Sequence, residues 1–521
     1  MFKNYTMNQL ILPLDLEIKL KENDIAFSIH HLIESIPNEA FTSLIKETGC
    51  PAYHPRMMLK IILCSYTQST FSGRKIEDLT KDSIRVMWLA QGYEPSYRTI
   101  NRFRVHPKVK ELLRQCFVQF RCQLVKEKLI DQEALFIDGT KIEANANKFT
   151  FVWKKSVERY HRDLEEKSNQ LYNDLLKKEI IPEIQRENDE ELSNEDLKKI
   201  AENLENIIEE YTEKIDNSVD VKERKELRKE RKTPKQMVKQ LHEWILRKQK
   251  YENDFRVFGT RNSYSKTDPD ATFMRMKDDH MRNGQLKAGY NLQIATEGQY
   301  TLAYGIYSNP GDTKTFIPFL DKIEQEYFRL PEHIVADAGY GSEENYDDIL
   351  TKRKRIPLIT HAYYLKEQKK KFKEDPFERK NWDYDEVKDE YVCPNQQRVT
   401  FRYHSTRKDK TGFQRSFKNY ECEKCAGCPF RIKCIQSGKS TNRKIAVNEK
   451  WEKQKEYIKK MLSEETGSIY RRRKIDVEPV FGFLKANLGF SRFSLRGKSK
   501  IENEIGFALM AVNLRKYAAT I

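Results

Sequence analysis

Two aspartates stand at the ends of short apolar runs that are typical of β-strands. Asp138 ends LFID before Gly-Thr, and Asp337 ends HIVAD before the Gly-rich turn AGYG. A carboxylate at the end of a buried strand usually faces a cleft, because burying it without a partner is costly. Two neighbouring carboxylates repel each other unless a cation lies between them, and divalent cations favour hard oxygen ligands. The pair therefore predicts a divalent-metal site.

A third carboxylate would complete such a site, and Glu478 in DVEPVFGFLK is the candidate. Lys485 follows seven residues later, two helical turns along the same face, where it could contact a phosphate. Phosphoryl-transfer sites often hold two metal ions about 3.5–4 Å apart. Asp476 is the local alternative to Glu478, and a plain surface acid is the other interpretation of Glu478.

The elements that would position these residues alternate in a definite order. A helix is predicted over residues 313–327, with Asp312 or Thr313 as its N-cap. Strands are predicted at residues 135–138, 289–296, 301–308, 333–341 and 355–360, the second and third forming a hairpin joined by EGQY.

This order of three strands, a helix and two strands is that of an RNase H-like α/β core. A right-handed crossover places the first strand and the strand after the helix side by side and parallel. We therefore expect Asp138 and Asp337 to be neighbours, although they are 199 positions apart in the chain.

Residues 54–130 are predicted to be helical, and one of their helices carries a row of arginines. In EPSYRTINRFR, Ile100 and Phe103 share a face while the arginines face elsewhere. The unit suits a helix-turn-helix-like DNA contact made by Arg98, Arg102 and Arg104. The alternative is a plain helical bundle with a solvated face.

Two long segments interrupt the predicted core. Residues 152–255 are dense in Glu, Lys, Asn and Leu, which predicts two or three long helices forming an arm, whose basic stretch 222–235 is best read as a solvated face. Six segments follow: a helical N-terminal DNA-binding domain, the first part of the catalytic core, the charged arm, the continued core, a basic Cys-rich insertion and C-terminal helices that complete the core, at residues 1–130, 131–151, 152–255, 256–360, 361–465 and 466–521.

The charge is unevenly distributed along the 521 residues, whose net charge is +16. Residues 51–130 carry +9, residues 131–350 carry −10 and residues 351–500 carry +20. Basic regions around an acidic middle favour a nucleic-acid partner, with acid where metals bind and base where phosphates lie. No run resembles a membrane span or a secretory signal, so we expect a cytoplasmic protein with no membrane partner.

Five of the nine cysteines cluster in the insertion with ligand-like spacing, C-x2-C-x2-C-x5-C preceded by Cys-Pro. Four thiolates can bind a structural Zn²⁺ ion, whereas an Fe–S cluster or free thiols are the alternatives. The candidates, four of five, are Cys393, Cys422, Cys425, Cys428 and Cys434. The basic, aromatic run RYHSTRKDKTGFQRSFKNY beside them suits a DNA-facing knuckle or a β-hairpin with a solvated basic face.

Four motifs together resemble the DDE transposases of bacterial insertion sequences: FIDGTKIEANAN, LKAGYNLQIA, ADAGYGSEENY and YRRRKIDVEPVFGFLK. The most similar group is the one called family eleven-eighty-two, which has a helical N-terminal domain and a Cys-rich insertion. The resemblance runs from about residue 50 to the C-terminus. It implies that Asp138, Asp337 and Glu478 form a catalytic triad that binds two Mg²⁺ or Mn²⁺ ions.

The related Tyr–Arg–Glu–Lys signature falls on Tyr470, Arg473, Glu478 and Lys485. Four residues separate the Arg from the Glu, where hairpin-forming relatives have three. Arg471 and Lys474 fit that other spacing, so both pairs are candidate DNA contacts.

The resemblance implies a nucleoid-associated DNA transposase that binds terminal inverted repeats, cleaves phosphodiesters and transfers strands. Its partners would be double-stranded transposon ends and target DNA, bound by a homodimer. The alternatives are an RNase H-like nuclease without strand transfer and a catalytically dead DNA-binding derivative.

Overall fold

The computed structural model describes residues 20–42, 44, 52–184, 191–276, 284–409, 412–435, 441–463 and 466–520. The chain divides into two compact units, Met1–Ile142 with Asn291–Ile521 and Glu143–Tyr290. None of the described helices has the length and apolar character needed to span a membrane.

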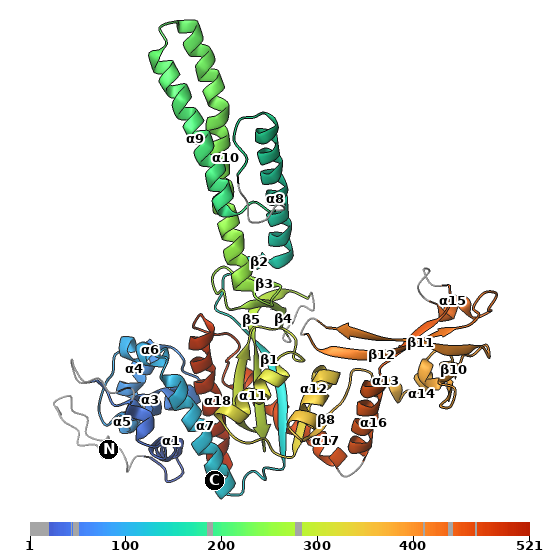
Figure 1. Ribbon diagram of the computed structural model, residues 1–521. Helices are drawn as coiled ribbons and strands as arrows, with labels where there is room; N and C mark the ends of the chain where they lie inside the picture. Colours follow the sequence, from blue (N-terminus) through green and yellow to red (C-terminus); the bar gives the residue numbers. More distant parts are fainter. Residues whose placement is uncertain are drawn as a thin grey trace, which may run out of the picture. The chain divides into compact units, whose positions relative to one another are not determined.

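The first unit is built on most of a six-stranded mixed sheet of order β4-β5-β1-β7-β8, in which β6 also pairs β5 (Figure 1). β1 and β7 pair in parallel, with Ile137 opposite Ala336, as the crossover argument predicts. β7 and β8 are also parallel, whereas β5 and β6 form an antiparallel hairpin. The strands are β1 (Ala134–Glu143), β5 (Leu286–Glu297), β6 (Tyr300–Tyr307), β7 (His333–Ala336) and β8 (Ile356–Ile359).

Two local details differ from the predicted elements. The β5–β6 hairpin closes through Gly298 and Gln299 alone, both at positive φ, because a two-residue turn of this kind matches the strand twist. Helix α11 (Phe316–Glu326) begins later than expected, after a turn in which Thr315 N donates to Asp312 O at 3.0 Å. Neither Asp312 nor Thr313 caps it, so the predicted cap is wrong.

The C-terminal helix α18 (Lys498–Thr520) is the central helix of this unit. It is buried on every side from Ile501 to Leu514, including its polar residues. The Asn513 side chain makes the two hydrogen bonds to Thr301 of β6 that a neighbouring strand would otherwise make. Its Nδ2 donates to Thr301 O at 2.7 Å, and its Oδ1 accepts from Thr301 N at 2.8 Å. The side chain thus satisfies backbone groups that an edge strand leaves unpaired.

The N-terminal helices pack against α18 and belong to the same compact unit. His54 caps α3 by accepting from Arg56 N at 3.2 Å, and Pro55 takes the first helical position. The helices are α1 (Ile25–Glu34), α2 (Glu39–Thr42), α3 (Pro55–Thr67), α4 (Gly73–Asp82), α5 (Ile84–Ala90), α6 (Tyr97–Arg104) and α7 (Val109–Lys126).

The Cys-rich segment contains a five-stranded antiparallel sheet in the order β13-β12-β11-β10-β9. The basic aromatic run forms the long hairpin of β11 and β12, and α16 (Glu449–Ser463) and α17 (Thr466–Gly482) follow. The strands are β9 (Asp383–Asp385), β10 (Glu390–Val392), β11 (Arg398–Lys408), β12 (Gln414–Cys422) and β13 (Lys444–Val447).

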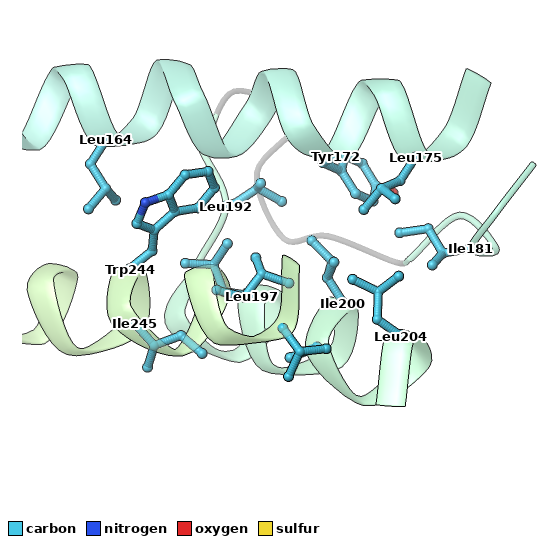
Figure 2. Close-up of a cluster of buried hydrophobic side chains, with 13 residues drawn as sticks. Leu164, Tyr172, Leu175, Ile181, Leu192, Leu197, Ile200, Leu204, Trp244 and Ile245 are labelled. Atoms are coloured by element: carbon cyan, nitrogen blue, oxygen red, sulfur yellow. The ribbon is translucent and has the colours of Figure 1, made fainter. Parts of the chain in front are cut away.

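The second unit includes more residues than the predicted arm, which was 152–255. It contains three long helices, α8 (Lys154–Lys177), α9 (Asn194–Asn217) and α10 (Val221–Phe258). Ser193 and Asp196 form a capping box that starts α9. Apolar residues at helical spacing in α9, among them Leu197 and Leu204, point into a cluster shared with the other two helices (Figure 2). Three short strands, β2 (Phe151–Trp153), β3 (Ser263–Ser265) and β4 (Thr272–Arg275), complete the unit.

Removing one side chain of this cluster should destabilise the second unit. Leu197 is fully buried, so Leu197→Ala should cost about 2–5 kcal/mol through lost burial and a cavity. Hydrogen exchange of peptides from residues 154–258 measures the loss. Leu246→Ala, on a side chain that is 67% exposed, is the control and should change stability by less than about 0.5 kcal/mol. Equal exchange in both variants would contradict the assigned core.

Candidate functional site

The structure brings Asp138 and Asp337 side by side on neighbouring parallel strands. Asp138 lies on β1 directly after Ile137, whose register partner Ala336 precedes Asp337. β1 continues to Glu143, so the prediction that Asp138 ends its strand is wrong, whereas Asp337 follows the last residue of β7. Asp138 is 7% exposed and accepts from Gly139 N at 2.7 Å, and Asp337 is half-buried and accepts from Gly339 N at 2.8 Å. The two carboxylates therefore lie where the pairing of β1 with β7 ends.

Helix α17 contributes a cation to this place rather than the predicted carboxylate. Arg473 Nη1 lies 3.3 Å from Asp138 Oδ2, and both side chains are largely buried. Glu478 is exposed and forms no hydrogen bond or ion pair with the described residues. Five residues turn an α-helix by about 140°, so a helix that directs Arg473 at Asp138 directs Glu478 elsewhere. The structure thus joins two members of the predicted triad and leaves out the third.

Asp476, the alternative to Glu478, has a structural role. It is 5% exposed and accepts from Thr296 Oγ1 at 2.6 Å. Burial raises the pKa of Asp476, while hydrogen bonds from Thr296 and from the turn residues Gly298 and Gln299 oppose the shift. Asp476 therefore attaches α17 to the β5–β6 hairpin, away from Asp138.

The signature residues of α17 occupy different environments. Tyr470 is half-buried, with its hydroxyl 3.1 Å from Thr360 Oγ1. Arg471 and Lys474, the pair at the alternative spacing, are both exposed, as a contact to a DNA phosphate requires.

Lys485 does not continue α17. The α-helix ends at Gly482, and Phe483–Asn487 form a π-helical turn in which Lys485 is half-buried. The two-turn relation between Glu478 and Lys485 assumes 3.6 residues per turn throughout, so it is wrong for this segment.

The three arginines of α6 also differ in their exposure to solvent. Arg98 and Arg102 are exposed. Arg104 is 3% exposed, donates to Tyr66 Oη at 2.7 Å, and lies 3.7 Å from a carboxylate oxygen of Glu504 on α18. A buried partner on a distant helix therefore holds the Arg104 guanidinium, and its predicted DNA contact stays a prediction.

A buried polar network beside the two aspartates was not predicted. Asp312 Oδ1 accepts from Asn291 Nδ2 at 2.7 Å and from Gln293 Nε2 at 3.1 Å. Tyr340 Oη donates to Gln293 Oε1 at 2.5 Å. Burial, reinforced by the carboxylates of Asp312, Asp138 and Asp337, holds the pKa of Tyr340 well above its ordinary value. The signal in the sequence was a pair of amides, two residues apart, in the otherwise apolar strand GYNLQIAT.

The five clustered cysteines line one small cavity of about 20 Å³, close to the space that one water molecule or ion requires. Cys393, Cys422 and Cys425 are buried, and Cys428 and Cys434 are half-buried. Arg443 N donates to Cys425 Sγ at 3.3 Å. Burial, with the neighbouring Cys425 thiol, raises the pKa of Cys422 to about 12. None of the described cysteines forms a disulfide.

The remaining cysteines are scattered. Scattered cysteines usually pack as small apolar residues, and Cys64 and Cys116 are fully buried. Cys122 is exposed instead, and Cys50 lies outside the described residues.

The aspartates and the clustered cysteines are residue types that bind metals, but the described side chains do not form a complete set of metal ligands. Within the described ranges, no group of three or more His, Cys, Asp or Glu side chains is arranged to hold an ion. Asp138 and Asp337 offer the hard oxygens that divalent cations prefer, and the cysteines offer thiolates suited to Zn²⁺. Both places fit their metals by residue type.

A side chain at Gly139 should disturb the site. A Cβ there would collide with the Gln293 amide and lie 2.9 Å from Asp312 Oδ1. Gln293 cannot move without breaking buried hydrogen bonds, so Gly139→Ala should cost about 1–3 kcal/mol in urea denaturation. Gly311→Ala, where a Cβ meets nothing within 4 Å, is the control and should be neutral. A neutral Gly139→Ala would contradict the packing described.

Two family models match separate parts of the chain. A model described as "Transposase domain (DUF772)" matches residues 14–106, and one described as "Transposase DDE domain" matches residues 392–518. The second match contains Glu478 and the five clustered cysteines, whereas Asp138 and Asp337 lie between the matches. No curated protein and no solved structure matches the chain. Transposase domains in both its N-terminal and C-terminal parts indicate a transposase, consistent with a DDE transposase of an insertion sequence.

Proposed function

We propose that the protein binds the terminal inverted repeats of an insertion sequence and catalyses their metal-dependent cleavage and strand transfer. The observation that carries the proposal is that Asp138 and Asp337 lie side by side where the parallel pairing of β1 and β7 ends, in a chain with two transposase matches. The strand order β6-β5-β1-β7-β8 supports an RNase H-like catalytic core.

Asp138, Asp337 and Glu478 are the proposed ligands of two Mg²⁺ or Mn²⁺ ions. Such ions supply Lewis-acid activation of the attacking oxygen and stabilise charge on the leaving oxygen. Arg473 neutralises Asp138 in this structure, so it holds that carboxylate in place before ions and DNA bind. Recruiting Glu478 requires α17 or its side chains to move.

The reaction has two steps at the same site. Water attacks a phosphodiester at the element end, the bond from phosphorus to the 3′ oxygen breaks, and a 3′-OH and a 5′-phosphate result. The 3′-OH then attacks a target phosphodiester, displaces its 3′ oxygen and joins the element to the target. Arg471, Lys474 and Lys485 are the proposed phosphate contacts beside this site, and Tyr470 and Arg473 would hold phosphates and a displaced base.

Arg98 and Arg102 on α6 are proposed to contact the inverted repeat, because both are exposed on one short helix. Two element ends must be held together for paired cuts, so we propose a homodimer on DNA. A transposase acts on chromosomal DNA, which places it with the bacterial nucleoid in the cytoplasm.

Cleavage of labelled element ends tests the assignment of the carboxylates. Asp138→Asn, Asp337→Asn and Glu478→Gln remove a charge at nearly constant shape. Each should keep DNA binding and lose more than about 100-fold in cleavage rate, beyond the loss typical of residues that only support metal ligands. Gel assays of cleavage and of binding with Mg²⁺ measure both quantities.

Asp476→Asn is the matched control on the same helix and should cleave like the parent. Cleavage at the parental rate by any of the three variants would exclude that residue. Cut ends without joined products would favour the nuclease alternative, and binding without cleavage by the parent would favour the catalytically dead derivative.

We propose further that the Cys-rich segment binds a structural Zn²⁺ ion. Cysteines from the end of β10, the end of β12 and the short helix α15 (Arg431–Cys434) converge on one cavity of ionic size. Cys393, Cys422 and Cys425 are the proposed buried ligands, with Cys428 or Cys434 as the fourth.

Elemental analysis of the purified protein tests this site. The parent should hold about one zinc ion per chain, and Cys425→Ser should lose it because three ligands bind weakly. Cys122→Ser, at an exposed thiol, should keep the metal, while Cys428→Ser and Cys434→Ser identify the fourth ligand. A metal-free parent would refute the site, and iron in place of zinc would favour a cluster.

A further inference from the structure

Asp312 lies in the turn between β6 and α11, but its side chain does not serve the helix. The main-chain oxygen of Asp312 accepts from Thr315 N at 3.0 Å and Thr315 Oγ1 at 2.8 Å. The carboxylate turns instead toward β5, where Oδ1 accepts from the amides of Asn291 and Gln293. The usual local role of an aspartate before a helix is therefore absent, and its tertiary contacts must explain the conformation.

Those contacts lead to the turn that carries Asp337. Asn291 and Gln293 are fully buried, and Gln293 Nε2 also donates to Asn291 Oδ1 at 2.9 Å. The other end of the Gln293 amide accepts from Tyr340, which is fully buried and three residues after Asp337. A hydrogen-bonded chain thus runs from the Asp312 carboxylate through Gln293 to Tyr340.

Asp312 is also close to both predicted metal ligands. A Cβ on Gly139, next to Asp138, would lie 2.9 Å from Asp312 Oδ1. A Cβ on Gly339 would lie 3.0 Å from Asp337 Oδ1 and 3.9 Å from Asp312 Oδ2. Asp312 Oδ1 thus lies near Gly139, next to Asp138, and Oδ2 lies near Gly339, two residues after Asp337.

The same loop is fixed to the Asp337 turn by its next residue. Thr313 Oγ1 donates to Gly339 O at 2.7 Å, and Asn345 Nδ2 donates to Thr313 O at 3.2 Å and to Tyr340 O at 2.7 Å. These bonds limit how far the Asp312 loop and the Asp337 turn can separate. These hydrogen bonds therefore hold Asp312 beside the candidate site.

We propose that Asp312 is a positioning residue of the candidate site, which holds the Asp337 turn through Gln293 and Tyr340 and adds negative charge that favours cation binding by Asp138 and Asp337. The proposal rests on the proposed function for the identity of the site. Both roles come from one carboxylate, because Oδ1 takes the two amide donors while Oδ2 faces the Gly339 side.

The two roles can be separated by substitution. Asp312→Asn can still accept both amide donors through its oxygen but lacks the charge. Asp312→Glu keeps the charge and is the conservative variant. Tyr340→Phe breaks the hydrogen-bonded chain and keeps every carboxylate.

Mn²⁺ binding by the full-length protein, followed by electron paramagnetic resonance, gives a readout that does not depend on cleavage. Asp312→Asn should bind Mn²⁺ roughly tenfold more weakly than the parent, and should need roughly tenfold more Mg²⁺ for half-maximal cleavage of labelled ends. Asp312→Glu should restore both values. Tyr340→Phe should unfold at lower urea with a smaller change in Mn²⁺ affinity.

Equal Mn²⁺ affinity in the parent and Asp312→Asn would overturn the proposal, and so would equal weakening in Asp312→Asn and Asp312→Glu, because only shape would then matter. A parent that binds Mn²⁺ but cuts no DNA would refute the proposed function, while the titration would still decide the role of Asp312. If Asp312→Asn does not fold, the Mn²⁺ affinities of Asp312→Glu and Tyr340→Phe are compared instead, and they decide the role of Asp312. A parent without Mn²⁺ binding would overturn both.

Discussion

The parallel pairing of β1 and β7 is the contact on which the candidate site depends. Parallel strands cannot be joined by a tight turn, so the chain must leave the sheet and return by a crossover. Here the return passes through the whole second unit, the β5–β6 hairpin and α11. Because Ile137 pairs with Ala336, the residues that follow them lie side by side where this pairing ends. Distance along the chain is irrelevant once that register is set.

Buried polar groups hold the rest of the first unit around this sheet. α18 carries Asn503, Glu504 and Asn513 into the core, and each needs a partner because unpaired polar groups are costly to bury. Asn503 donates to the main chain at the end of α6 and just after it, Glu504 lies beside Arg104, and Asn513 pairs with β6. Buried polar contacts thus join α18 both to the N-terminal helices and to the sheet.

The acidic excess of the middle of the chain is not shared evenly between the two units. The second unit carries 31 basic and 31 acidic residues and is neutral. Residues 291–350 carry 3 basic and 11 acidic residues, a net charge of −8. The excess therefore belongs to the first unit and not to the arm, and some of its carboxylates, among them Asp321 and Asp348, pair with Arg353.

The sequence by itself determined the five strands β1, β5, β6, β7 and β8, the long helices, the parallel placement of Asp138 beside Asp337 and the clustering of five cysteines. These depend on apolar periodicity, on strand handedness and on short spacings, all of which are local or general. Only the tertiary structure decided that Arg473 and not Glu478 contacts Asp138, that Arg104 is buried, and that Asp312 turns to β5 instead of capping α11. Those outcomes depend on which face of a helix or turn meets a partner hundreds of residues away, because burial makes each polar group take the partner that packing brings to it.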